Sequence, residues 1–133
     1  MSQENVEMVR RGLEHFRKTR DFLDQDFAKE FVWDMSTFRG WPEQKTYEGI
    51  EGAREFIRTW AGAWDEWELH IVGLHDAGDR VVAVMRQRGR AKSTGLAVDM
   101  TFAQVFTIEG GRETRMQMYA DPAEALAALG LSE

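Results

Sequence analysis

Hydrophobic and polar residues alternate most clearly between residues 97 and 119. In the first part of this stretch every second residue is apolar, with Gln104 as the exception. Side chains along a strand point alternately to the two faces of a sheet, so the apolar positions share one face. The sequence EGGR at residues 109–112 supplies the glycines that a hairpin turn favours. The pattern predicts two paired strands whose apolar face holds a single amide, its other members being Val98, Met100, Phe102, Phe106, Ile108, Met116 and Met118.

Helical periodicity marks two stretches in the first half of the chain. Apolar residues recur at intervals of three and four from Val6 to Phe16, which predicts an amphipathic helix. The same spacing returns at residues 49–64 and predicts a helix whose apolar side includes Trp60 and Trp64.

The segment between these two helices combines several patterns. Leu23, Phe27 and Phe31 are four residues apart, which predicts a second helix from residue 21 to about residue 30. Residues 31–38 are rich in aromatic side chains and alternate loosely, so we expect a short strand there. Residues 39–48 contain glycine and proline and predict a loop.

The remaining elements are strands and a final helix. Long runs at residues 67–77 and 80–92 predict two strands, joined by a Gly-Asp turn. Asp121 followed by Pro122 is a strong signal for a helix start, and Gly130 ends that helix. Asp121 is therefore expected to act as a helix cap.

Helices that come first and strands that follow are typical of an α+β fold. We expect one domain over residues 1–133, because this length suits a single core. Its centre would be an antiparallel sheet of four strands, packed on three N-terminal helices, with a short C-terminal helix. A sheet that curls against helices leaves room for a pocket.

The composition excludes several classes of function. The chain carries 17 basic and 23 acidic residues, a net charge of −6, which argues against nucleic acid or an anionic membrane as a partner. It contains no cysteine, so disulfides and thiolate chemistry are excluded. No apolar run reaches membrane-spanning length and no signal-peptide pattern is present, so we expect a cytoplasmic protein.

Other residue patterns do not indicate a metal or cofactor. His70 and His75 lie on one expected strand and His15 on a remote helix, a distribution that does not indicate a metal site. There is no glycine-rich phosphate loop between a strand and a helix, so no cofactor is expected. Arginines alternate along residues 86–90 and predict a solvated or subunit-contacting outer face, with Met85 and Gln87 on the inner one.

Asp34 is the candidate catalytic residue. It lies in an aromatic strand between Trp33 and Met35, where a carboxylate is unusual. If Asp34 faces the helices, desolvation raises its pKa toward values that suit a general base. The alternative is a solvated residue on the outer face of an edge strand.

Gln104 is the candidate polar anchor for a ligand. An amide inside an apolar stripe can bond a ligand carbonyl or hydroxyl, or it can satisfy a neighbouring helix end or side chain. Apolar side chains around it could line a cavity or fill a solid core, and these two arrangements look alike in sequence. The candidate wall residues are Trp60, Trp64, Met85, Phe102, Met116 and Met118.

Several stretches together resemble the SnoaL-like branch of the nuclear-transport-factor-2-like superfamily, which also includes ketosteroid isomerases and polyketide cyclases. They are MSQENVEMVRRGLEHF, VWD, YEGIEGAREFIRTW, GDRVVAV, RGRAKSTG and GGRETRMQMYADPAEALAALG. The resemblance implies a conical sheet with an apolar interior, and a homodimer formed through the outer sheet face. It also implies that Asp34 is similar in position to the base of the isomerases.

The chain departs from the isomerases at their oxyanion site. Leu13 or Phe16 lies near the position of their tyrosine, and Ala103 or Gln104 replaces their acid. Without strong donors to an oxyanion, steroid isomerase activity is not expected. The cyclases place an acid near Asp121, which already serves as a helix cap.

The resulting hypothesis is a protein that binds an apolar or aromatic small molecule. If it is an enzyme, it is a cofactor-free isomerase, cyclase or lyase acting next to a carbonyl, with Asp34 as base and Gln104 as anchor. The alternative is a non-catalytic ligand-binding or dimerisation module, in which Asp34 points outward or forms a salt bridge.

Overall fold

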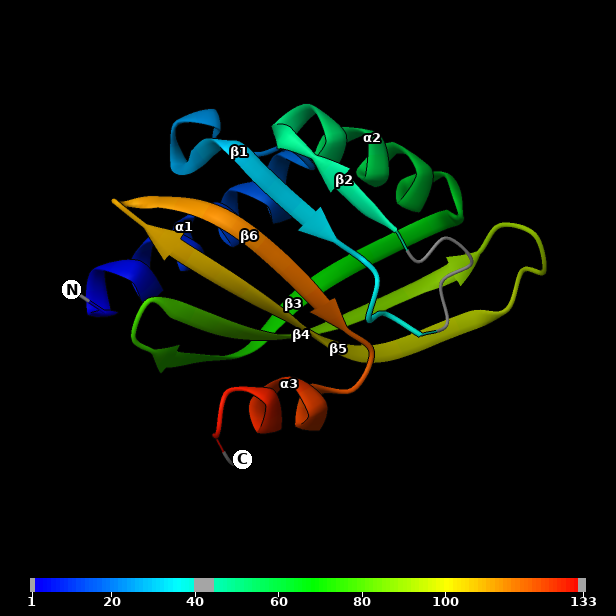
Figure 1. Cartoon of the computed structure of the whole chain (residues 1–133). Helices are drawn as coiled ribbons and strands as arrows, with labels where there is room; N and C mark the ends of the chain where they lie inside the picture. Colours follow the sequence, from blue (N-terminus) through cyan, green and yellow to red (C-terminus); the bar gives the residue numbers. More distant parts are fainter. Residues whose placement is uncertain (1, 40–44, 132–133) are drawn as a thin grey trace.

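The computed structural model describes residues 2–39 and 45–131. Helices and strands are confirmed in most of the expected places, and Figure 1 shows their arrangement. In chain order the elements are α1 (Ser2–Thr19), the 3-10 turn η1 (Asp24–Asp26), β1 (Phe27–Asp34), β2 (Thr46–Glu48), α2 (Gly49–Gly62), β3 (Trp64–Ala77), β4 (Arg80–Ala91), β5 (Ala97–Glu109), β6 (Arg112–Tyr119) and α3 (Pro122–Ala128).

The sheet has six strands in the order β2-β1-β6-β5-β4-β3 and is mixed, not purely antiparallel. Strand β1 runs parallel to β6, while the other neighbours are antiparallel. The prediction of four antiparallel strands was therefore wrong, because β1 and the short β2 extend the sheet beyond β6. The sheet is curved but remains open, with β2 and β3 as its two edges.

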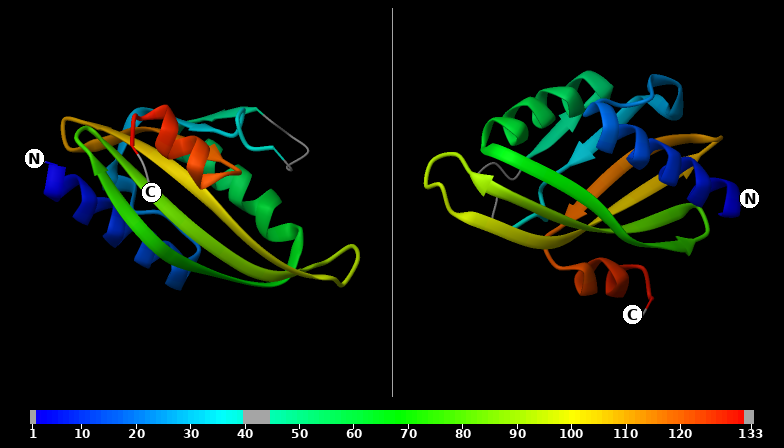
Figure 2. Two further views of the ribbon diagram at one scale, coloured as in Figure 1. Left: turned by 90° about the horizontal axis from the view of Figure 1, so that it is seen from below. Right: turned by 180° about the vertical axis from the view of Figure 1, so that it is seen from behind.

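The two faces of the sheet are covered by different helices. Helices α1 and α2 lie on one face, called the inner face here, and α3 lies on the other (Figure 2). The larger apolar core fills the space between the inner face and α1 and α2. A smaller core joins α3 to β4 and β5 through Val82, Val84, Ala103, Val105, Ala125 and Leu126.

The second N-terminal helix predicted at residues 21–30 is absent. The structure has only the turn η1 there, followed by β1. Phe27 and Phe31 are four residues apart, and an interval of four places two side chains on one face of a strand as well as on one side of a helix. Their rings are in edge-on contact, 4.9 Å apart. Two α-helices, not three, thus cover the inner face among the described residues.

Strand β1 begins four residues earlier than predicted and ends at Asp34. The loop predicted at residues 39–48 was wrong in its last part, because Thr46–Glu48 pairs with β1 as β2. Its glycine and proline, Gly40 and Pro42, lie outside the described residues.

The two long hairpins and the C-terminal helix are confirmed. Gly110 and Gly111 adopt φ angles of 60° and 77° at the predicted turn, a region that glycine enters without steric cost. Asp121 caps α3, since its Oδ1 accepts a hydrogen bond from the backbone N–H of Ala123 at 3.0 Å. None of the helices in the described part of the chain has the length and apolarity needed to cross a membrane.

Candidate functional site

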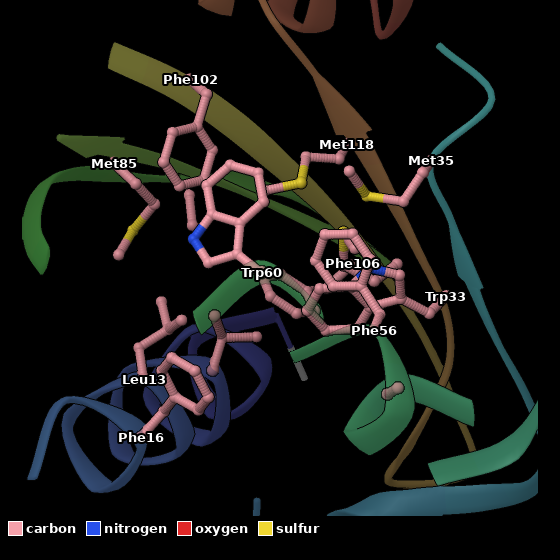
Figure 3. Close-up of a cluster of buried hydrophobic side chains, with 14 of the residues drawn as sticks. Leu13, Phe16, Trp33, Met35, Phe56, Trp60, Met85, Phe102, Phe106 and Met118 are labelled. Atoms are coloured by element: carbon pink, nitrogen blue, oxygen red, sulfur yellow. The ribbon is translucent and has the colours of Figure 1, made fainter. Parts of the chain in front are cut away.

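An apolar chamber lies between the inner face of the sheet and helices α1 and α2. Its free space is about 50 Å³, room for several water molecules or a small chemical group. Side chains from both helices and from strands β4–β6 converge on it, as Figure 3 shows for many of them. The apolar walls include Leu13, Phe16, Trp60, Phe102, Phe106 and Met118.

A second, more open cavity lies next to the chamber, at the end of the sheet where β4 meets β5. This outer cavity has a volume of about 480 Å³ and is lined by residues such as Phe38, Trp64 and Met100. Trp60 and Phe102 line both spaces and so form the wall between them. A movement of these two side chains would join the chamber to the outer cavity.

Two buried amides face the chamber. Gln87 is 1% exposed, and its Oε1 accepts a hydrogen bond from Trp60 Nε1 at 2.9 Å. Gln87 Nε2 and Gln104 Oε1 have no hydrogen-bond partner within the described part of the chain. Buried polar atoms normally have a partner, so these two atoms mark places where a ligand or an ordered water is expected.

Glu113 is the third polar residue of the chamber wall, and a β-bulge turns it inward. Thr107 pairs with Arg115 and Ile108 pairs with Glu113, so Thr114 is an extra residue in β6. Because of this extra residue, Glu113 lies on the same inner face as Met116 and Met118, whereas strict alternation would put it on the outer face. Its side chain is 2% exposed, and Oε1 has no partner among residues 2–39 and 45–131.

Asp26 of η1 lies close to Glu113 and is also buried, at 6% exposure. Burial, and then the neighbouring charge of Asp26, raise the pKa of Glu113 well above its usual value. Burial raises the pKa of Asp26 as well, although the positive charge of Arg11 opposes that effect. Glu113 lines the chamber and Asp26 lies next to Glu113 outside the lining, and the two carboxyl groups together are called the acid end.

Asp34 does not line the chamber, contrary to the expectation for a catalytic base. Trp33 faces the chamber, so the next residue in β1 points to the outer face. There Asp34 accepts a short hydrogen bond from Arg115 Nη2 and a bond of 2.8 Å from the backbone N–H of Ser36. Burial opposes ionisation, but the bonds from Ser36 and the charge of Arg115 outweigh it, so the pKa of Asp34 is lowered. An outward or salt-bridged Asp34 was the alternative left open by the sequence, whereas its burial there was not expected.

The predicted wall residues fall into two groups. Gln104, Trp60, Phe102 and Met118 line the chamber, and Trp64 lines the outer cavity together with Trp60 and Phe102. Met85 and Met116 line neither space and are fully buried in the core. Glu113 and Asp26 were not among the predicted site residues. The inward direction of Glu113 depends on the bulge at Thr114, and the burial of Asp26 follows from its place in η1 beside Glu113.

The arginines at residues 86 and 88 lie on a partly exposed face, as expected, and form ion pairs that the sequence pattern did not predict. Arg86 and Arg88 both contact Asp99 of β5, at 2.6 and 3.5 Å, on partly exposed side chains. In the portion of the chain that the structure describes, no three histidine, aspartate or glutamate side chains are grouped to hold a metal ion.

Comparisons with known proteins give one family and many structural neighbours. A family model described as SnoaL-like domain matches residues 7–116. No functionally curated protein matches the chain in sequence.

Similar solved structures share the fold at low sequence identity. TerC, co-crystallised with polyporic acid, is 20% identical, with a TM-score of 0.74 over 96% of this chain and 98% of that one. A putative SnoaL-like polyketide cyclase from Jannaschia sp. CCS1 is 22% identical, with a TM-score of 0.71 over 96% and 92% of the two chains.

A third similar structure is a protein with a ketosteroid isomerase-like fold from Catenulispora acidiphila, in complex with trimethylamine. It is 17% identical to this chain, with a TM-score of 0.66, and the match covers 90% of this chain and 92% of that one. At these identities the likeness is one of fold.

Proposed function

The chain belongs to the SnoaL-like domain family, and on that basis we propose that it binds a small, largely apolar molecule at the chamber and the outer cavity. The buried amides Gln87 and Gln104 carry the proposal. Each has a polar atom without a partner in the described structure, inside a wall that is otherwise apolar. A ligand with one or two hydrogen-bonding groups would satisfy these atoms, while aromatic side chains enclose the rest of it.

The outer cavity supports the same proposal. Its volume of about 480 Å³ lies within the range of ligand pockets. Trp64 lines this cavity, and its indole Nε1–H has no partner within residues 2–39 and 45–131. An indole N–H is a donor only, so it suits a carbonyl or ether oxygen on the ligand.

The fold alone does not specify the ligand. One structural neighbour was crystallised with polyporic acid and another with trimethylamine, an acid and an amine. The lining residues of this chain must therefore set its own preference.

Catalysis by Asp34 is not part of this proposal. Proton abstraction would require Asp34 to leave Arg115, gain a higher pKa and reach the chamber from the other face of the sheet. A binding protein fits the observed pairing of Asp34 better than an enzyme that uses Asp34 as its base.

The proposal can be tested with 2-naphthol, a neutral aromatic molecule with one hydroxyl group. Tryptophans line both spaces, so we expect saturable quenching of tryptophan fluorescence. Gln104→Leu should change the dissociation constant by about fivefold or more, since it removes a buried hydrogen bond to the ligand.

The matched control is Gln117→Leu, the same change on the neighbouring strand β6 but on the outer face of the sheet. Gln117 pairs with Val105 and lines neither space. An equal effect of both variants, or no saturable binding, would contradict the proposal.

A further inference from the structure

The acid end of the chamber is the most unusual part of the site. Glu113 lies opposite Phe27 of β1 in the sheet, and Asp26 directly precedes Phe27. The rings of Phe22 and Phe27 are 5.7 Å apart in edge-on contact, and both line the chamber beside Glu113. Glu113 and two aromatic rings thus line one end of the chamber, and the carboxyl group of Asp26 lies next to Glu113.

Each carboxyl group at the acid end has an oxygen that the described residues leave without a partner. These atoms are Glu113 Oε1 and Asp26 Oδ2. The residues that line the chamber include no arginine, lysine or histidine. Arg11 is the cation that acts on Asp26, and its own side chain is exposed on α1. The acid end therefore lacks a positive group of its own inside the chamber.

The acid end is separate from the amides. Gln104 and Ile108 are four residues apart on β5, and Ile108 pairs with Glu113. At about 3.3 Å per residue, Gln104 and Glu113 are about 13 Å apart along the sheet. The chamber is therefore elongated, with different chemistry at its two ends.

An ammonium group satisfies all the features of the acid end. It donates hydrogen bonds to carboxylate oxygens and carries the positive charge that the wall lacks. The faces of aromatic rings attract cations within about 6 Å. A carbonyl could accept a hydrogen bond from protonated Glu113 but would give Asp26 Oδ2 no donor, and a carboxylate would add a further negative charge beside Asp26.

We propose that the acid end, formed by Glu113 and Asp26 beside Phe22 and Phe27, binds an ammonium group of the ligand. This inference rests on the proposed function, because it assigns a ligand class to the same chamber. The bulge at Thr114 supports it, since bulges commonly redirect side chains next to binding sites.

Binding has a proton balance that can be measured. In the empty chamber burial and the charge of Asp26 raise the pKa of Glu113 and so favour its protonated form. An ammonium ion that enters favours the carboxylate, so the proton of Glu113 leaves to the solvent. No covalent bond to carbon or nitrogen changes. Protons should therefore be released when the ammonium ion binds, and the number released per bound ion should change with pH.

The test uses n-butylammonium and n-butanol, which have similar size and differ in charge. Tryptophan fluorescence gives the two dissociation constants, and an indicator in weakly buffered solution gives the proton release. We expect n-butylammonium to bind the wild-type protein at least about tenfold more tightly than n-butanol. Glu113→Gln should remove this preference and the proton release, with n-butanol affected less than about twofold.

Glu109→Gln is the matched control, because Glu109 is exposed on the same hairpin. It should leave both affinities unchanged. Tighter binding of n-butanol, or n-butylammonium binding without proton release, would overturn the ammonium assignment while leaving the proposed function intact. Absence of binding by n-butanol, n-butylammonium and 2-naphthol alike would overturn both. The proton release of the wild-type protein keeps the test valid even if Glu113→Gln does not fold.

Discussion

The carboxylate of Asp34 is bound to the guanidinium of Arg115 on the outer face of the sheet, across the parallel pair β1 and β6. Asp34 is 2% exposed, whereas the Arg115 side chain is 45% exposed. The pair therefore joins a buried anion to a cation that reaches solvent. It ties two strands that are far apart in the sequence.

Arg115→Met should lower the free energy of unfolding by about 1–3 kcal/mol at pH 7, because it leaves a buried carboxylate without its cation. Arg112→Met is the control, since Arg112 is exposed at the start of the same strand. It should cost less than about 0.5 kcal/mol. Urea denaturation measures both values, and equal effects would show that the ion pair does not stabilise the fold.

The contribution of Asp34 should depend on pH in one direction. Its pKa is lower in the folded protein, so its stabilisation is present above the unfolded pKa and is lost as the pH falls through the folded value. Asp34→Asn should therefore be less stable than the wild type at pH 7 and approach it below about pH 3. Urea unfolding at several pH values checks this convergence.

Glu113 should show the opposite dependence. Its pKa is raised in the folded protein, so stability declines as the pH rises above the ordinary glutamate value toward the folded value. Without ligand, Glu113→Gln should be more stable than the wild type at pH 8 by about 1 kcal/mol or more, and similar to it near pH 4. An unchanged difference between the two pH values would show that Glu113 is not a buried acid.

Gln104→Leu should change the free energy of unfolding by less than about 1 kcal/mol, because Gln104 Oε1 has no partner in the described structure. Gln87→Leu should cost more, since it removes the acceptor of the Trp60 indole N–H. Thermal and urea unfolding compare the two variants. A loss above about 2 kcal/mol for Gln104→Leu would mean that this amide supports the core.

Trp60→Phe should destabilise the protein by about 1–3 kcal/mol, because Gln87 then loses its donor inside the apolar wall. The combination of Trp60→Phe with Gln87→Leu should cost less than the sum of the single changes. A double-mutant cycle in urea measures this coupling. Additive effects would show that the Trp60–Gln87 hydrogen bond has little weight.

The sequence correctly predicted those secondary-structure elements whose residue pattern fits only one type of structure. The hairpin at Gly110-Gly111 and the cap at Asp121 follow from local chemistry, and both are present. The spacing of Phe27 and Phe31 fits a strand and a helix equally well. A helix was therefore expected where the first residues of β1 lie.

The site was harder to predict because its residues depend on contacts distant in sequence. The position of Gln104 on the chamber wall could be predicted, because Gln104 interrupts an apolar stripe that remains regular around it. Asp34 was misplaced because its partner, Arg115, lies 81 positions away. Strict alternation from Met116 and Met118 would put Glu113 on the outer face, and its actual direction depends on how β6 pairs with β5.

Because Thr114 is an extra residue in β6, the hairpin of β5 and β6 has two possible pairing registers near its turn. Without a bulge at this place, Thr114 would lie opposite Ile108, and Glu113 would face water opposite Glu109. The two registers differ by a shift of one residue in the pairing of β6 with β5. The position of the extra residue thus decides whether the carboxyl group of Glu113 or the hydroxyl group of Thr114 faces the interior. An insertion or deletion in this turn could exchange the two groups without any substitution.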